Sequence, residues 1–595
     1  MTTSRPWLKV YSELGIDDDF HVPDATMYQM LAQAGATWPD KSAFFYLGKR
    51  MTYQDLLSEV DACAAAFVAM GIGARDSVVL SLPNVPAVVI CFYALNKIGA
   101  RAVMTHPLSS PTELKHYIGV SESQWAVTMD MFYPVFRDLA DQSGLKKIVI
   151  AKFSDYLSKT MKLGFAVTKG RKIPSVPGKD SRVLMWKDFL AQGETGESTR
   201  RWRWGGHGDE AQGAGEAGSP SGEGYQRPIT PDETAVILFS GGTTNLPKGI
   251  ELSSANFNAL AVSMKKITGL QVQDSILAIL PAFHGFGLGL CIHTPVCLGA
   301  YFILVPEFST EIYINNLIKY EPSFIAGVPT LYQALMSNPK FEKVRFDKLK
   351  GAYSGGDMLS ADLKARFDQM IINQGSQTEL IEGYGLTECV TACVVSPRLH
   401  YRDNSMGIPI PGMDVKVALS ATGEEVPYGQ EGEICITGPT LMQGYIQDPE
   451  ATAHTLRVHA DGRTWLHSGD IGTMDEDGYL YFMGRMKRII KVSGVSVYPM
   501  QVEQVLEAHP LVSRACVIGL PDEYQMSSVK AFVLLADGST GSDAQRAELI
   551  AYCKKHLIKW AVPRQIEFRT ELPTTRVGKI AYTELEHEEA AKLAG

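Results

Sequence analysis

The segment at residues 239–249, FSGGTTNLPKG, combines glycines, hydroxyl side chains and one lysine directly after an apolar run. Glycines let backbone N–H groups approach an anion, Thr243 and Thr244 can donate hydrogen bonds to phosphate oxygens, and Lys248 adds a positive charge. The residue after Lys248 is Gly249, so the segment does not match the Walker pattern GxxxxGK[ST]. It predicts a phosphate-binding loop of another class, with a glycine-rich surface turn as the alternative.

Five further segments, each with glycine beside polar residues, follow in order. They are SGGDM at 354–358, EGYGLTE at 382–388, HSGD at 467–470, GRMKRIIK at 484–491 and LPTTRVGKI at 572–580. Together with the loop they resemble the ordered motifs of the AMP-forming adenylating superfamily, which includes acyl-CoA synthetases, peptide-synthetase adenylation domains and beetle luciferases. The resemblance extends from residue 51 to the last segment and is weakest at 150–228. One such motif is weak evidence, whereas six in the same order are strong evidence.

The resemblance implies a reaction in two steps. A carboxylate attacks the α-phosphate of ATP to give an acyl-adenylate and pyrophosphate, and a thiol then displaces AMP. Thr243, Thr244 and Lys248 match the positions that hold the β- and γ-phosphates, and Thr387 matches the contact to the α-phosphate. Glu388 matches the ligand of Mg²⁺, a hard cation that needs oxygen ligands.

The nucleoside contacts implied by the resemblance come from the second to fifth segments. Tyr384 would stack on adenine, Asp470 would accept hydrogen bonds from both ribose hydroxyls, and Arg485 would be the neighbouring ribose contact. In isolation a tyrosine is usually a core residue and an aspartate after glycine usually forms a turn, but their joint order favours a site. The expected ATP and AMP site is completed by Ser354, Gly355, Gly356, Asp357, Glu382, Gly383 and Gly385.

The C-terminal motifs imply a change of conformation between the two steps. Lys579 resembles the adenylation lysine of the family, whose charge bridges the attacking carboxylate and the α-phosphate. Lys487 occupies the hinge position, about which the C-terminal domain is expected to rotate. Lys491 and Gly494 match the face presented after rotation, where the CoA thiol enters. The implied catalytic set is therefore Lys579, Thr387, Glu388 and Lys248.

Two places depart from the family pattern. The family loop commonly reads Ser-Gly-Thr-Thr-Gly, whereas this chain has Gly241 at the first position and Asn245 at the last. Asparagine tolerates left-handed dihedral angles, so we expect the turn to persist with a weaker grip on pyrophosphate. Met526 and Ser527 stand where the family often has Gly-Glu. A degenerate relative that only binds acyl groups or nucleotide is the hypothesis from a different class.

Small and apolar residues are expected to line the acyl pocket. The expected lining is Phe283, His284, Gly285, Gly287, Gly327 and Val328. No early aspartate is present to capture an amino group, which disfavours an amino-acid substrate. His284 matches a position that gates the substrate in relatives, with a buried histidine bonded to the backbone as the alternative.

Two segments point to the acid class. Residues 329–335 and 407–417 look most like bacterial fatty-acyl-CoA synthetases. We therefore predict a medium- to long-chain fatty acid:CoA ligase that uses ATP, Mg²⁺ and CoA. An aryl or bile-type acid:CoA ligase and a fatty acyl-AMP ligase that loads a carrier protein remain alternatives.

The elements that must position these residues alternate along the chain. Residues 53–70 and 87–98 have helical periods and flank the β-rich run 77–82, an alternation that implies a largely parallel sheet. The charged junction at 484–491 precedes a second βα pattern. We predict the α/β class, with a large N-terminal domain of βα-layered sheets at 1–486 and a small hinged α+β domain at 487–595.

Composition narrows the partners and the compartment. The 595 residues suffice for several domains, and a net charge of -9 gives no broad attraction to nucleic acid, so no nucleic-acid partner is expected. Nine cysteines show no disulfide framework, which fits a reducing cytoplasm. Cys389 and Cys393 lack further ligands at zinc spacing and are interpreted as core residues.

Three stretches bear on membranes and mobility. Residues 287–306 have no formal charge, but interior His, Pro and Gly favour a short helix and a buried strand over a membrane span. Residues 159–182 and 200–204 are basic with apolar and tryptophan residues, which favours peripheral contact with the inner membrane surface; a solvated loop is equally consistent. Residues 205–224 are glycine-rich and predict a mobile part of a variable insert at 150–228.

Overall fold

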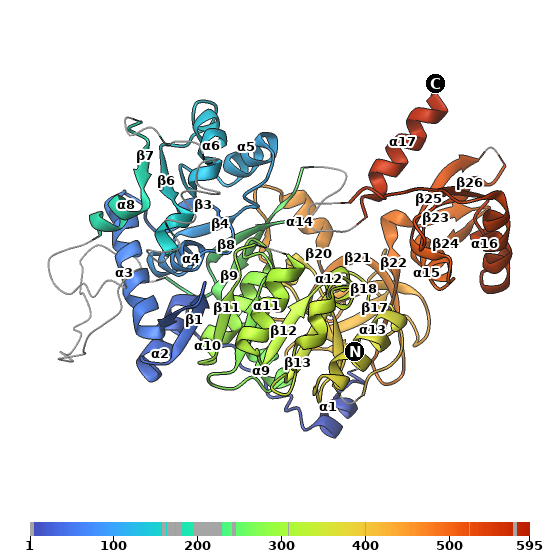
Figure 1. The fold of residues 1–595 in the computed structure, drawn as a ribbon, viewed down its shortest axis with the longest axis horizontal. Coiled ribbons are helices and arrows are strands. Elements are labelled where there is room, and N and C mark those ends of the chain that lie inside the picture. The colour runs from blue at the N-terminus through green and yellow to red at the C-terminus, as the bar shows by residue number, and fades with distance from the viewer. Residues whose placement is uncertain are drawn as a thin grey trace.

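The computed structural model of the chain contains three sheets in a large N-terminal part and a fourth in a smaller C-terminal part, counted over the described residues (Figure 1). The described residues are 5–157, 162, 173, 176, 180–193, 229–240, 246–307, 309–398, 400–522, 524–574 and 580–594. The predicted class and the division into a large and a small domain are confirmed.

One N-terminal sheet has eight strands and is parallel from β8 to β7. In order, its strands are β19 (Gly444–Tyr445), β9 (Gly249–Ser253), β8 (Thr234–Phe239), β4 (Arg101–Met104), β3 (Ser77–Ser81), β5 (Trp125–Met129), β6 (Lys147–Ala151) and β7 (Val183–Met185). Every residue of β3 is buried, as is typical of a parallel strand covered on both faces.

Helices α3 (Tyr53–Ala69) and α4 (Pro86–Ile98) begin and end where their sequences direct. Thr52 and Asp55 form a capping box at the start of α3, which satisfies N–H groups that lack helical partners. Pro86 opens α4 and Gly99, with φ of 74°, ends it in the left-handed region that glycine tolerates. The predicted helices at 53–70 and 87–98 and the strand at 77–82 are confirmed.

A second sheet has nine strands and is parallel from β1 to β14. In order, its strands are β16 (Ile408–Pro409), β15 (Val394–Val395), β14 (Leu380–Tyr384), β13 (Gly351–Gly355), β12 (Phe324–Gly327), β10 (Ser275–Ala278), β11 (Tyr301–Leu304), β1 (Ser42–Tyr46) and β2 (Lys49–Thr52). Helices α11 (Thr310–Tyr320), α12 (Pro329–Met336) and α13 (Ala361–Asn373) pack on it through a cluster of buried apolar side chains.

The uncharged stretch 287–306 lies inside this part of the molecule. It forms the π-helical segment η4 (Phe286–His293), the short helix α10 (Thr294–Cys297) and strand β11, and most of its residues are buried. The expectation of a short helix followed by a buried strand is confirmed. Within the described part of the chain, no helix has both the length and the apolar character needed to cross a membrane.

The third sheet is antiparallel, and the βα alternation did not predict it. Its strands are β17 (Asp414–Ala418), β18 (Gly432–Thr437), β21 (Thr464–Met474) and β20 (Leu456–Val458) in order, with β22 (Leu480–Arg485) paired to β21. A tight turn joins β21 to β22, and in it Asp475 Oδ1 accepts hydrogen bonds from the backbone N–H groups of Asp477 and Tyr479 at 3.0 and 2.9 Å. Such an Asx turn permits a direct antiparallel return without a crossover helix.

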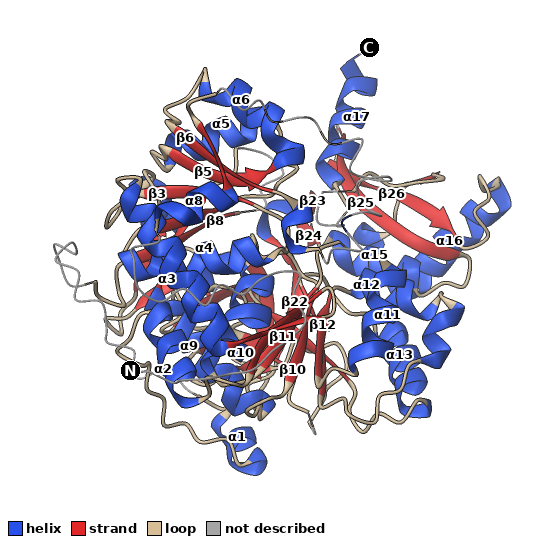
Figure 2. Cartoon of the chain, turned by 60° about the vertical axis from the view of Figure 1, so that its left-hand side comes forward, coloured by secondary structure: helices blue, strands red, loops and turns tan. Residues whose placement is uncertain are grey.

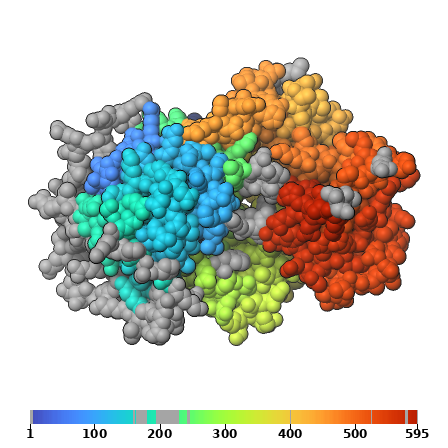
Figure 3. All heavy atoms as spheres, turned by 90° about the horizontal axis from the view of Figure 1, so that it is seen from above, coloured from blue at the N-terminus to red at the C-terminus, as the bar shows by residue number. Residues whose placement is uncertain are grey.

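The C-terminal part lies to one side of the N-terminal part in the three overall views (Figures 1, 2 and 3). Its elements are β23 (Ile490–Val492), β24 (Val495–Val497), α15 (Pro499–Glu507), β25 (Val512–Asp522), β26 (Met526–Leu535), α16 (Asp543–His556), β27 (Gln565–Phe568) and α17 (Tyr582–Ala594). Tyr498 donates a hydrogen bond to Glu431 Oε2 at 2.7 Å, which ties the start of α15 to the N-terminal part.

The predicted insert at 150–228 is only partly an insertion. Strand β7 extends the eight-stranded sheet, and α8 (Trp186–Gln192) packs on α3 through Phe189 and Phe67, whose ring centroids are 4.9 Å apart. The glycine-rich residues 205–224 and the basic segment 200–204 lie outside the described residues. Of residues 159–182, only Lys162, Ile173, Val176 and the last three residues, 180–182, are described.

Candidate active site

The carboxyl ends of three neighbouring parallel strands bring several predicted site residues together. Gly327 pairs with Ser354 across β12 and β13, and Ser354 pairs with Glu382 across β13 and β14. Gly355 pairs with Gly383 in the same register. Ligands of open α/β sheets bind at such strand ends.

Glycine is required where the backbone turns away from β14. A Cβ atom on Gly385 would lie 1.4 Å from the carbonyl oxygen of Thr391, so no side chain fits there. Gly356 has a φ of 82°, in the region that favours glycine, and its neighbour Asp357 accepts a hydrogen bond from the Met358 N–H at 3.0 Å. Gly385 therefore allows two chain segments to approach closely, and Gly356 permits a left-handed backbone conformation.

Three predicted nucleoside contacts meet at Asp470. Tyr384 donates a hydrogen bond from its hydroxyl to Asp470 Oδ2 at 2.7 Å, and Arg485 Nε lies 3.2 Å from Asp470 Oδ1. Asp470 and Arg485 are cross-strand partners on β21 and β22, and the Asp470 side chain is 1% exposed. Burial, followed by the Asp470 charge, raises the pKa of Tyr384 well above its ordinary value, so the phenol stays protonated as the donor.

Glu382, two residues before Tyr384 on β14, is itself buried. Its Oε1 accepts a hydrogen bond from the Leu359 N–H at 3.1 Å. Burial raises the pKa of Glu382 to about 7, although the hydrogen bond from Leu359 opposes the shift. The carboxyl therefore titrates near neutrality instead of near pH 4.

The predicted phosphate side contains Lys248 and Glu388, linked through Tyr445. Tyr445 donates a hydrogen bond to Glu388 Oε1 at 2.8 Å, and Lys248 Nζ lies 4.6 Å from the centre of the Tyr445 ring. Lys248 Nζ is also 4.0 Å from Asp448 Oδ2. Thr387 precedes Glu388 in a 3₁₀ turn, Thr387–Cys389. Thr243 and Thr244 lie outside the described residues.

The loop that carries Phe283 and His284 is held by contacts with Asn84 and His106. Asn84 accepts a hydrogen bond from the Ala282 N–H at 2.9 Å and donates one to the Leu280 carbonyl at 3.0 Å. The Phe283 ring packs on His106, with ring centroids 4.4 Å apart. His284 Nδ1 accepts a hydrogen bond from the Phe286 N–H at 3.2 Å, a local backbone contact of the kind expected under the alternative interpretation of this histidine.

The predicted acyl segments pack against the segment that follows Glu388. A Cβ atom on Gly285 would lie 1.6 Å from the Val390 carbonyl oxygen, and one on Gly287 would lie 2.2 Å from the Pro281 carbonyl oxygen. Val390 itself has a φ of 64°, a strained value for a β-branched residue. Val328 Cγ1 is 3.7 Å from the position of a Cβ on Gly356, so the acyl and nucleoside segments are neighbours.

The predicted C-terminal residues lie on the smaller part. Lys487 is exposed in the 3₁₀ turn Met486–Arg488. Lys491 Nζ donates to Ser496 Oγ at 2.6 Å across the β23–β24 hairpin, and Gly494, with φ of 83°, forms its turn. Lys579 lies outside the described residues; the flanking Thr574 and Ile580 form an antiparallel bridge.

Sequence reasoning missed several residues that support the site. Tyr445 and Asp448 belong to the stretch GYIQDPE at 444–450, whose aromatic and acidic residues were the available signal. Glu433 and His467 form a buried pair, with His467 Nδ1 2.7 Å from Glu433 Oε2. Cys389 and Cys393 are fully buried, which confirms their interpretation as core residues.

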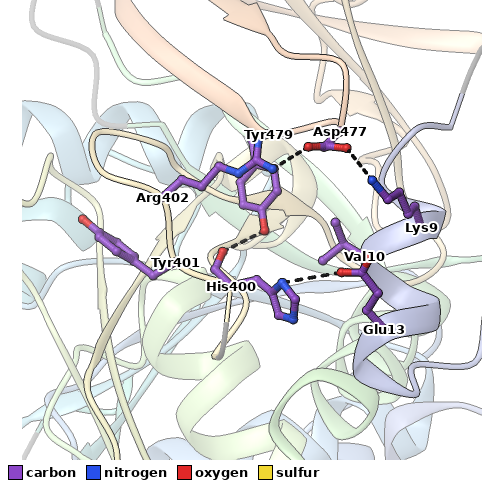
Figure 4. A pocket seen from close by; sticks show the side chains of 8 residues that line it. All are labelled: Lys9, Val10, Glu13, His400, Tyr401, Arg402, Asp477 and Tyr479. Atoms are coloured by element: carbon purple, nitrogen blue, oxygen red, sulfur yellow. Dashed lines mark hydrogen bonds and ion pairs between the residues drawn. The ribbon is translucent and has the colours of Figure 1, made fainter.

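A cavity of about 210 Å³ lies at the opposite end of the β21–β22 hairpin, under helix α1 (Leu8–Leu14) (Figure 4). Its charged side chains pair with one another: Lys9 with Asp477 at 3.3 Å, Arg402 with Asp477 at 2.5 Å and His400 with Glu13 at 3.6 Å. The polar lining fastens α1 to the hairpin turn. We interpret this cavity as part of a structural contact.

Comparison with known sequences identifies the family. The model of the AMP-binding enzyme family matches residues 31–446, and that of the AMP-binding enzyme C-terminal domain matches residues 501–579. This chain belongs to the AMP-binding enzyme family. The resemblance stated from the six motifs is confirmed.

Two relatives of this AMP-binding enzyme match nearly its whole length, and a third matches part of it. It is 31% identical to the long-chain-fatty-acid–CoA ligase of Bacillus subtilis over 99% of both chains, and 30% identical to that of Salmonella typhimurium over 96% of this chain and 95% of the relative. A feruloyl-CoA synthase of Amycolatopsis is 34% identical over 62% of this chain and 72% of the relative. The crystal structure of an anthranilate CoA ligase with anthranoyl-AMP has the same fold, with a TM-score of 0.78, 24% identity and coverage of 96% and 98%.

Proposed function

We propose that this AMP-binding enzyme is an acid–thiol ligase that activates a medium- to long-chain fatty acid with ATP and transfers the acyl group to CoA. AMP and pyrophosphate are the other products. The observation that carries the proposal is the similarity to long-chain-fatty-acid–CoA ligases over nearly the full length of both chains. The hydrogen bond between Tyr384 and Asp470, with Glu388 four residues after Tyr384 on the same segment, supports the nucleotide chemistry.

In this proposal, Asp470 binds the ribose. A carboxylate offers about four lone-pair directions, so Asp470 can accept hydrogen bonds from ribose hydroxyls in addition to those from Tyr384 and Arg485. Its low exposure means that ribose must displace or share the Arg485 contact, which is on the exposed side of the pair. Tyr384, held by its hydroxyl, presents a fixed ring on which adenine can stack.

Glu388 fits the implied Mg²⁺. Glu388 is half-buried and accepts a hydrogen bond from Tyr445, whose ring also contacts Lys248, and Mg²⁺ commonly binds one or two carboxylates together with substrate phosphates. When bound, the ion would neutralise charge on the phosphate oxygens. Lys248 would bind the outer phosphates with Thr243 and Thr244, and Thr387 the α-phosphate.

Each of the two steps is a nucleophilic displacement, in which one bond forms and one bond breaks. A carboxylate oxygen of the fatty acid bonds to the α-phosphorus while the bond to pyrophosphate breaks, and Lys579 would stabilise the charge that develops there. The thiolate of CoA then bonds to the acyl carbon and AMP leaves. We propose rotation about Lys487 between residues 1–486 and 487–595, with Lys491 and Gly494 on the face that meets CoA.

The fatty-acid assignment rests on the relatives and on the character of the expected lining, Phe283, His284, Gly285, Gly287, Gly327 and Val328. These residues are small or aromatic, which suits an alkyl chain. The partial match to a feruloyl-CoA synthase favours an aryl acid as the second candidate. A carrier protein in place of CoA remains the third.

A mass-spectrometric screen tests these candidates. The purified protein is incubated with Mg-ATP, CoA and fatty, aryl or bile-type acids, and acyl-AMP and acyl-CoA are measured separately. We expect acyl-CoA and AMP with alkyl acids. Thioester from aryl acids alone would support the second candidate, adenylate without thioester would support carrier loading, and no product with any acid would overturn the ligase assignment.

A cytoplasmic location with peripheral contact to the inner membrane surface is also proposed. Its support is the basic, tryptophan-containing composition of residues 159–182 and 200–204. Flotation with vesicles containing anionic lipid tests the contact, and removal of 200–204 should weaken it. Equal flotation with neutral and anionic vesicles would contradict it.

A further inference from the structure

Glu433, at the second position of β18, is a buried carboxylate that accepts two hydrogen bonds from the segment leading to Asp470. Its Oε1 accepts from the Gly469 N–H at 2.9 Å, and its Oε2 accepts from His467 Nδ1 at 2.7 Å. Burial alone would raise the pKa of Glu433, but these two donors hold it below its ordinary value. The carboxylate is therefore charged at neutral pH, and its two hydrogen bonds hold the HSGD segment in place.

The backbone of HSGD is shaped so that Gly469 can make this contact. Gly469 has a φ of 70°, and the ladder between β18 and β21 shifts register between Glu433 and Cys435. Ser468 Oγ donates to the Ile434 carbonyl at 2.6 Å and accepts from the Asp470 N–H at 3.0 Å. A β-bulge of this kind redirects the side chain that follows it, which here is Asp470.

A second histidine completes the network behind His467. His459 Nε2 lies 2.9 Å from His467 Nε2, and the His459 ring stacks on Trp465 with centroids 5.7 Å apart. Burial lowers the pKa of His459 to about 4, with further lowering from nearby Lys416 and His467. His467 therefore bridges the two groups: its Nδ1 lies at hydrogen-bond distance from Glu433, and its Nε2 lies at hydrogen-bond distance from His459.

Glu433, Cys435 and His467 lie close enough together to raise the question of a metal site. The separation of 2.7 Å between Glu433 Oε2 and His467 Nδ1 is a hydrogen-bond distance. Two ligands about 2.0 Å from one tetrahedral ion would be roughly 3.3 Å apart. Burial also raises the pKa of Cys435 to about 12, so its thiol stays protonated. The arrangement is that of a hydrogen-bond network.

We propose that Glu433 is a positioning residue that, through His467 and the Gly469 N–H, holds Asp470 in place for the two ribose hydroxyls. The inference rests on the proposed role of Asp470 in nucleotide binding. Glu433 does not touch the nucleotide in this proposal; it fixes the backbone from which Asp470 projects. Loss of the Glu433 charge would let the Asp470 side chain move, and it would lower the affinity only for nucleotides that carry ribose hydroxyls.

The test compares ATP with 2′,3′-dideoxy-ATP, which lacks both hydroxyls. Dissociation constants of the Mg²⁺ complexes are measured by calorimetry without acid or CoA, in the unchanged protein and in Glu433→Gln. The unchanged protein should prefer ATP by at least about tenfold, since hydrogen bonds to a charged group are worth about 1.5–3 kcal/mol. In Glu433→Gln this preference should fall about tenfold, with affinity for dideoxy-ATP unchanged.

Matched variants separate positioning from general damage. Glu425→Gln makes the same acid-to-amide change in the same sheet region, where Glu425 faces Lys416, and should keep the full preference. His467→Asn removes the ring that links Glu433 to His459 and should repeat the Glu433→Gln result. It also supplies the measurement if Glu433→Gln does not fold.

Different results would contradict the positioning role of Glu433 and the ribose-binding role of Asp470. If the unchanged protein shows no preference for ATP over dideoxy-ATP, Asp470 does not bind the ribose and both proposals fall. If the unchanged protein shows the preference and both Glu433→Gln and His467→Asn retain it, only the positioning role is overturned. An equal loss of affinity for both nucleotides would likewise overturn it, because that result indicates a purely structural role.

Discussion

The proposed nucleoside end of the site, around Asp470, and the proposed phosphate end, around Lys248, are built differently. Asp470 is 1% exposed and engages Tyr384 and Arg485 at 2.7 and 3.2 Å. The side chains of Lys248 and Asp448 are 45% and 42% exposed and stand 4.0 Å apart. A buried charge must be paired to be tolerated, whereas an exposed ion pair contributes little and can rearrange. We therefore expect the nucleoside end to be fixed before ligand binds and the phosphate end to adapt.

This difference suits the order of the proposed reaction. Pyrophosphate leaves after the first step, while the adenylate must stay until the thiol arrives. A fixed nucleoside end can retain the adenylate, and a phosphate end whose Lys248 side chain is 45% exposed can release pyrophosphate. Gly241 and Asn245, which differ from the family loop and lie outside the described residues, would also favour pyrophosphate release if they weaken pyrophosphate binding as expected.

The largest effect is expected outside both ends, at Lys579. Lys579→Ala should lower the rate of acyl-adenylate formation about 10²- to 10³-fold, the usual cost of removing one group that stabilises transition-state charge. ATP affinity should change little, since neither end of the site is altered. Single-turnover formation of acyl-AMP is the measurement, with Lys555→Ala, an exposed lysine of α16, as control. A near-normal rate would remove Lys579 from the proposed mechanism.

The next largest effect comes from making the same aspartate-to-asparagine change at each end of the site and comparing the two variants. Asp470→Asn should weaken ATP binding about 10- to 100-fold, because it removes the charge from a buried, hydrogen-bonded carboxylate. Asp448→Asn should weaken it less than about threefold, because its partner is exposed. Calorimetry with Mg-ATP measures both. Equal losses in the two variants would contradict the contrast between a fixed and an adaptable end.

Local patterns and long-range contacts were not equally predictable. The helix at Tyr53–Ala69 was predictable from the helical period of its apolar residues, and Thr52 and Asp55 form the capping box at its start. The order of the glycine-containing motifs identified most of the proposed site. The antiparallel sheet was not predicted, because antiparallel neighbours such as β21 and β22 are joined by a turn and need no crossover helix, so they leave no βα alternation in the sequence. Tyr445 and Glu433 were missed because their partners, Glu388 and His467, lie on other elements. Only the register of the folded strands brings these pairs together.

The nucleoside end should also carry a measurable pH dependence, from Glu382. Its pKa in the folded protein is about 7, above the ordinary value of a glutamic acid, so the folded state binds more protons than the unfolded state between those two values. Stability should therefore fall as pH rises through this window. Glu382→Gln cannot titrate, and between pH 5 and pH 8 it should gain on the order of 2 kcal/mol relative to the unchanged protein.

Thermal unfolding measures this gain. The difference in Tm between Glu382→Gln and the unchanged protein is determined at pH 5 and at pH 8, and the two differences are compared. Glu424→Gln, at an exposed position, controls for the loss of one negative charge. A gain that is the same at both pH values would show that Glu382 does not titrate in this window. The buried carboxyl of Glu382 would then not be a source of pH dependence at the nucleoside end.

The smallest effect is expected from Tyr445→Phe at the phosphate end. The change removes the hydroxyl that donates to Glu388 Oε1 and keeps the ring that lies 4.6 Å from Lys248 Nζ. One such hydrogen bond is worth about 1 kcal/mol, so the Mg²⁺ concentration at half-maximal rate should rise about three- to fivefold. Affinity for AMP, which needs neither Glu388 nor Lys248, should stay unchanged.

Tyr524→Phe, at a tyrosine that is 93% exposed, is the matched control and should leave both quantities unaltered. Tyr445→Leu removes the ring as well and should add a loss in pyrophosphate affinity, because Lys248 then lacks the aromatic face that orients it. If Tyr445→Phe weakened AMP as much as it raised the Mg²⁺ requirement, Tyr445 would support the nucleoside end too. The two ends would then be mechanically joined through Glu388, and the distinction between a fixed and an adaptable end would not hold.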